Sequence, residues 1–184
     1  MDDQPRTLEQ IQAGLDEVRR SPVDHGVVRR IVRRPAVEAR EAVDAARISV
    51  ATGLDGDCWA TRGSKRMPDG SADREAQVTV MNSRFAALVA GEPERWDAAG
   101  DQLYVDLDLG VENLPPGARI TVGGAVLEIS EVPHTGCVKF SGRFGADALR
   151  AVSTPEGRAL RLRGVNTRVI ESGEVRVGDP VRRI

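Results

Sequence analysis

Short runs of β-branched and aliphatic residues, separated by Gly, Pro and Asp, occupy most of the chain from Gly26 onward and set the strongest limit on its fold. In the most regular run every second residue is apolar: Leu103, Val105, Leu107 and Leu109. A period of two puts such side chains on one face of a strand, so we expect that face to be buried. Many short strands with few short helices predict a mainly β domain, an antiparallel barrel or sandwich.

Turn signals between these runs predict two hairpins. The first would turn at Gly123 and Gly124, because tight hairpin turns need the positive φ angles that glycine accepts easily. The second would turn over residues 171–174, between two runs rich in valine. Each hairpin would pair two consecutive strands.

The first 25 residues have a different pattern. Thr7 and Gln10 have the spacing of a capping box, and apolar residues follow at helical intervals. A helix is therefore predicted from about Leu8 to Arg20, ending before a proline at position 22. We expect two parts, an N-terminal helical extension over residues 1–25 and a β-barrel domain over residues 26–184.

Charge and hydropathy exclude two classes of partner. The chain has 26 Lys and Arg against 28 Asp and Glu, a net charge of −2, which offers no bulk attraction to nucleic acid. The first residues are acidic and polar, unlike a signal peptide, and no run reaches the roughly 18 apolar residues of a membrane span. We therefore expect a cytoplasmic protein that binds neither nucleic acid nor a membrane.

The two cysteines, Cys58 and Cys137, form neither a disulfide framework nor a zinc-binding spacing. Cys137 lies in a loop after a predicted strand, within three residues of His134 and Lys139. A loop thiol near cations is the usual setting of a nucleophile or of a ligand for a soft metal. The alternative is that Cys137 is a small buried apolar side chain.

Other polar residues lie at predicted turns and strand ends. The turn containing Gly56 and Asp57 can direct backbone amides toward an anion, and Asn113 follows the most regular strand. Alternation over residues 159–163 predicts that Arg161 and Arg163 lie on one side of a strand, where two guanidinium groups can hold an oxyanion. Each feature also has a structural interpretation, as an ordinary turn, a loop hydrogen bond or an exposed sheet face.

Six segments occur together in an order that resembles one known family, the MOSC domain. The segments are GLDGD at 53–57, QVTVM at 77–81, GVENL at 110–114, ITVG at 120–123, PHTGC at 133–137 and GEVRVGD at 173–179. The family is named for the C-terminal domain of molybdenum cofactor sulfurases and also occurs alone in small bacterial proteins. The resemblance covers roughly residues 26–184.

The resemblance implies a MOSC-like β-barrel that binds the molybdenum cofactor (molybdopterin). In the family, the residue that corresponds to Cys137 carries sulfur or contacts molybdenum in relatives that reduce N-hydroxylated compounds. The expected activity is thus that of a sulfur-transfer protein or a molybdenum cofactor-dependent oxidoreductase, served by a separate sulfur donor or electron-transfer protein. Cys137 would be the catalytic residue and metal ligand, and the cofactor would be bound by Gly56, Asp57, Asn113, His134, Lys139, Arg161 and Arg163.

An alternative function remains open, a non-catalytic barrel that binds a small anion or a partner protein and in which Cys137 is structural. The sequence also departs from the family at two positions. Gly136 precedes the cysteine where the family most often has proline, and Cys58 stands where relatives often have a basic residue.

Overall fold

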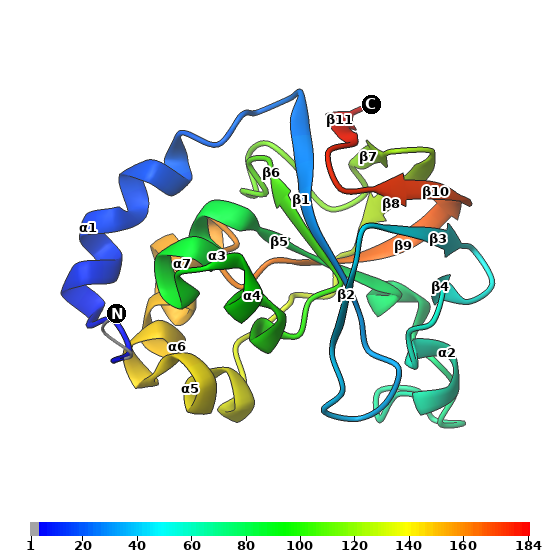
Figure 1. Ribbon diagram of the computed structural model, residues 1–184, viewed down its shortest axis with the longest axis horizontal. Helices are drawn as coiled ribbons and strands as arrows, with labels where there is room; N and C mark the ends of the chain where they lie inside the picture. The colour runs from blue at the N-terminus through cyan, green and yellow to red at the C-terminus, as the bar shows by residue number, and fades with distance from the viewer. Residues whose placement is uncertain (1–3) are drawn as a thin grey trace.

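The computed structural model describes residues 4–184, and its centre is a closed barrel of seven strands (Figure 1). Around the barrel the strand order is β11-β7-β8-β9-β5-β6-β1, and pairing between β11 and β1 closes it. Only β5 and β6 are parallel among these neighbours. The strands are β1 (Gly26–Arg33), β5 (Val78–Asn82), β6 (Leu103–Asp106), β7 (Arg119–Val122), β8 (Ala125–Ile129), β9 (Val165–Glu171) and β11 (Pro180–Arg183). The predicted β-barrel is confirmed.

Four further strands extend this arrangement. Strand β2 (Glu41–Val43) pairs with β1, and a separate small sheet has the order β10-β3-β4. Its strands are β3 (Ala45–Ser49), β4 (Gly53–Leu54) and β10 (Gly173–Arg176). The first predicted hairpin is present as β7 and β8. The second prediction is wrong, because β9 pairs with β8 and β5 whereas β10 pairs with β3.

The apolar face of the most regular strand lies inside the barrel. Leu103, Val105, Leu107 and Leu109 are all buried in the barrel core, as the period of two predicts. Tyr104, on the opposite face of β6, is also fully buried, in a second apolar core between the barrel and the helices. The barrel wall is therefore covered on this side.

Helices cover one side of the barrel (Figure 1). The N-terminal helix α1 (Leu8–Arg19) begins at the predicted capping box and buries Ile11, Leu15 and Val18 in the second core, mainly against α3 and α6. The other helices in this layer are α3 (Ser83–Ala90), α4 (Pro93–Trp96), α5 (Val138–Phe144), α6 (Ala146–Ser153) and α7 (Pro155–Ala159). Short helices α2 (Trp59–Arg62), η1 (Arg74–Ala76) and η2 (Asp97–Ala99) complete the chain. Over residues 4–184, no helix combines the length and apolar character needed to cross a membrane.

Candidate functional site

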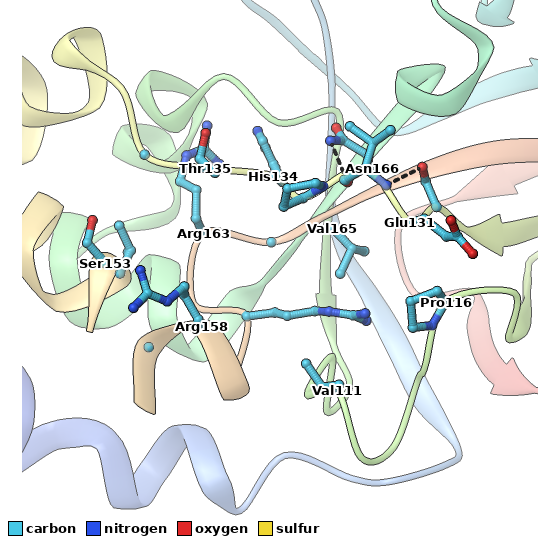
Figure 2. A pocket seen from close by; sticks show the side chains of 18 residues that line it. Val111, Pro116, Glu131, His134, Thr135, Ser153, Arg158, Arg163, Val165 and Asn166 are labelled. Carbon is cyan, nitrogen blue, oxygen red and sulfur yellow. Dashed lines mark hydrogen bonds between the residues drawn. The ribbon is translucent and has the colours of Figure 1, made fainter. Parts of the chain in front are cut away.

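A cavity of about 370 Å³ lies where the barrel meets α6 and α7. One wall is the loop that connects β8 to α5, at residues 130–136, and another is the segment 157–166 that connects α7 to β9. Figure 2 shows Thr135, His134 and Asn166 on one side and Val111 and Pro116 on the opposite side. Loops held by a rigid barrel are a common place for a binding site. We call this space the site cavity.

A buried ion pair supports the wall of the site cavity. The Arg163 Nη1 donates to Asp101 Oδ2 at 2.6 Å, and its Nη2 donates to the Ala99 carbonyl at 2.9 Å. The guanidinium also lies 5.0 Å from the ring centroid of Phe140, which is on α5. Because both charged groups are buried, each depends on the other for compensation of its charge.

His134 lies beside this ion pair. Its Nδ1 is 3.4 Å from Asp101 Oδ1, and neither atom has a hydrogen-bond partner among the described residues. Burial, with a smaller contribution from the charge of Arg163, lowers the pKa of His134 to about 4 although Asp101 opposes this shift. At neutral pH the imidazole is therefore uncharged, with one ring nitrogen as a hydrogen-bond donor and the other as an acceptor.

This shift predicts a pH dependence of stability. Unfolded His134 takes up a proton below its ordinary pKa of 6.5, whereas folded His134 remains neutral down to about pH 4. Protonation therefore favours the unfolded state over this window, and the free energy of unfolding should fall by up to about 3 kcal/mol as pH decreases through it. Urea unfolding of the wild type and His134→Gln at several pH values measures the difference. If the free energy of unfolding changes equally with pH in the two proteins, the lowered pKa of His134 is contradicted.

The structure corrects the expected position of Arg161. Residues 159–163 do not form a strand, because α7 ends at Ala159 and a turn follows before β9. Arg161 has a φ of +47° in this turn, and its Nη1 donates to the Leu114 carbonyl at 2.5 Å and the Leu109 carbonyl at 3.4 Å. Arg161 and Arg163 are thus not a pair on one strand face, although both line the site cavity.

Cys137 is exposed at the amino end of α5, directly after the loop that lines the site cavity. It is the N-cap residue of α5, and its side chain makes no capping hydrogen bond. The adjoining Gly136 lines the cavity and packs so closely against α6 that a Cβ there would lie 2.5 Å from a Leu149 methyl group. An exposed thiol does not fit the alternative of a small buried apolar side chain.

Three arginines gather around Gly100, and we call them the arginine cluster: Arg34, Arg40 and Arg143. Asp57 pairs with Arg34 at 2.7 Å, and Glu38 pairs with both Arg143 and Lys139 of α5. Arg40 forms no ion pair within 4.0 Å among residues 4–184; its Nη1 donates to the Ala39 carbonyl at 2.6 Å, and its buried Nε has no hydrogen-bond partner. Burial and the charges of Arg143 and Arg34 lower its pKa, although the charge of Glu38 opposes this shift.

Comparison with known proteins decides the family. The model of the MOSC domain matches residues 69–182, more than half of the chain. This chain belongs to the MOSC domain family. No curated protein matches the sequence significantly.

Solved structures share the fold of this MOSC domain. The YUAD protein of Bacillus subtilis is similar with a TM-score of 0.61 and 16% identity, over 85% of this chain and 94% of that one. YiiM of Escherichia coli is similar with a TM-score of 0.55 and 17% identity, over 86% of this chain and 69% of that one. At sequence identities this low, the structural similarity shows a common fold and nothing more.

The residues that the sequence singled out occupy three places in this MOSC domain. His134, Arg161 and Arg163 line the site cavity, and Lys139 is on α5 two residues after Cys137. The other predicted residues lie outside the cavity lining: Gly56, Asp57 and Asn113. Gly56 has a φ of +81° in its turn, beside the Arg33 side chain. Asp57 holds Arg34, and Asn113 donates to the Val23 and Asp108 carbonyls at 2.8 Å each.

Sequence reasoning missed the residues that carry much of the charge at this site. The sequence did not predict Asp101, Arg40 or Arg143, because residues far away in the sequence form the surroundings of each. Asp101 lies two residues before the start of β6, which was the one local signal available. No group of three or more His, Cys, Asp or Glu in the described part of the chain could hold a metal ion.

Proposed function

We propose that this MOSC domain binds the molybdenum cofactor and uses Cys137 either to carry sulfur or to ligate molybdenum during reduction of N-hydroxylated compounds. The observation that carries the proposal is the exposed Cys137 thiol at the amino end of α5, one residue after the loop that lines the site cavity and two residues before Lys139. Sulfur is soft and polarizable, so a single thiolate suits both roles.

The residues around Cys137 fit the molybdenum cofactor. A single cysteine without neighbouring protein ligands suits a metal that arrives inside a cofactor, because the cofactor's own sulfur atoms supply the other ligands. The cofactor also carries a phosphate. The guanidinium groups of Arg40 and Arg143 and the ammonium of Lys139 supply positive charge for such an anion.

Glu38 contacts two of the cations that would hold the phosphate of the cofactor. Its carboxylate contacts Lys139 and Arg143 from the loop between β1 and β2, where it has a φ of +63°. A phosphate that approaches α5 would compete with this carboxylate for the same two cations. Glu38 and Lys139 are exposed, so loss of their contact costs little.

When bound, the cofactor would supply a molybdenum centre able to exchange electrons or sulfur. The chain itself would supply the Cys137 thiolate, the phosphate donors of the arginine cluster, and a neutral His134 at the wall of the site cavity. For sulfur carriage, a separate protein would donate the sulfur.

The Arg40→Gln variant tests this arrangement. Loss of a charge-assisted hydrogen bond should weaken binding of the cofactor by roughly ten- to a hundredfold. The measurement is the pterin that stays with the folded protein after dialysis, compared with Arg47→Gln, a control at an exposed arginine of β3. Equal retention by the two variants would contradict the role of the arginine cluster. Failure of every form to retain pterin would favour the non-catalytic alternative.

A further inference from the structure

Arg161 is a guanidinium in the wall of the site cavity without an acidic partner. Its recorded contacts are the two main-chain carbonyls of Leu109 and Leu114, both made through Nη1. No carboxylate pairs with it within residues 4–184, and burial lowers its pKa with no opposing charge. A half-buried cation of this kind keeps donor capacity for an anionic ligand.

The chain holds this guanidinium in a fixed position. Leu162 N donates to the Gly157 carbonyl at 2.9 Å and Gly164 N donates to the Arg161 carbonyl at 2.7 Å, which together close the turn. Arg161 adopts its left-handed conformation inside this turn, a conformation that side chains other than Gly, Asn and Asp rarely take. Such strained residues concentrate at ligand sites.

The rest of the site cavity is lined by both apolar and charged side chains. Val111 and Pro116 face the cavity on one side, while Val152 and Val165 contribute further apolar surface. Arginines outnumber the single acidic lining residue, Glu131, by three to one. A volume of about 370 Å³ falls within the roughly 300–1,000 Å³ range typical of small-molecule pockets.

A carboxylate matches these features better than a phosphate. Arg163 is already engaged by Asp101, so Arg161 is the half-buried cation left to bind a ligand, with the exposed Arg158 at the rim beside Ser153 (Figure 2). A guanidinium can pair with either anion, but one guanidinium compensates the single charge of a carboxylate and only part of the charge of a phosphate dianion. The apolar walls then require an apolar body on the same molecule.

We propose that the site cavity binds a small organic carboxylate, with its carboxylate on Arg161 and its apolar body against Val111, Pro116 and Val165. The loop that lines the cavity through Gly136 continues directly to Cys137, so one short segment would contact the bound molecule and carry the residue expected to perform the chemistry. The assignment of this ligand as the substrate rests on the proposed function, whereas the binding itself does not. The substrate class would thus be a carboxylate-bearing compound.

Binding of two matched probes to the cofactor-free protein tests the proposal. The probes are 3-phenylpropionate and its neutral amide, 3-phenylpropionamide, titrated by NMR with amide-resonance mapping. The carboxylate should bind at least tenfold more tightly than the amide, and the perturbed resonances should include residues 111, 131–136 and 161–166. Arg161→Gln should abolish the preference, and the exposed β11 control Arg182→Gln should keep it.

Each other outcome has a defined meaning. Equal affinity for the two probes, tighter binding of inorganic phosphate at the same resonances, or perturbations outside the cavity would overturn the proposal. Thermal unfolding checks the fold of Arg161→Gln, and if it fails to fold, the wild-type map and the probe preference decide alone. Carboxylate binding by a protein that never retains the cofactor would keep this inference and refute the proposed function.

Discussion

Cys137→Ser should lose sulfur-carrying or reductive activity by roughly 10³-fold or more, as expected when a nucleophile is removed. Serine is a poor nucleophile and a hard ligand, so neither proposed role survives the change. The fold should be unaffected, because the side chain is exposed and Cys137 is an N-cap without a capping hydrogen bond. Serine is itself a favoured N-cap residue, so the melting temperature should stay the same or rise slightly.

Cys58→Ser is the matched control for this experiment. Cys58 is the half-buried N-cap of α2, and its amide donates to the Arg34 carbonyl at 2.8 Å. Its replacement should leave most of the activity. Equal losses in the two variants would indicate a site with two thiols, and full activity in Cys137→Ser would refute the thiol chemistry.

The second large effect is expected at Asp101. Asp101→Asn removes the charge that compensates Arg163 while keeping the shape of the side chain, and it leaves a buried guanidinium without a counterion. Breaking a buried pair in this way typically costs about 3–5 kcal/mol of unfolding free energy. Urea unfolding at neutral pH measures the loss.

Glu41→Gln provides the control for Asp101→Asn. Glu41 pairs with Arg33 at 2.8 Å on β1 and β2, and both side chains are exposed. Exposed pairs contribute little to stability, so this variant should unfold close to the wild type. If Asp101→Asn is no less stable than Glu41→Gln, the buried ion pair does not support the cavity wall.

Features coded by neighbouring residues could be predicted from the sequence. The period of two in β6 places Leu103 and Val105 in the barrel core, and the capping box at Thr7 begins α1. The glycines at 123 and 124 turn the first hairpin. In each case the signal and the structure lie within a few residues of each other, and the distant contacts agree with the local pattern.

Features that depend on distant partners could not be predicted. The valine-rich run in β10 pairs with β3, more than a hundred residues away, instead of with β9. The alternation near Arg161 was misinterpreted although a helix signal was present, since Thr154 caps α7 by accepting from the Gly157 amide and Pro155 is its first residue. Arg40 and Asp101 gain their roles only when the barrel brings separate loops together.

The central claim is that this MOSC domain holds the molybdenum cofactor. The most direct measurement is the molybdenum and pterin content of the protein purified from cells with an intact cofactor pathway. We expect nearly equimolar pterin and protein, with molybdenum in similar amount, and a marked loss of pterin in Arg40→Gln. Folded protein that carries neither pterin nor molybdenum would contradict it.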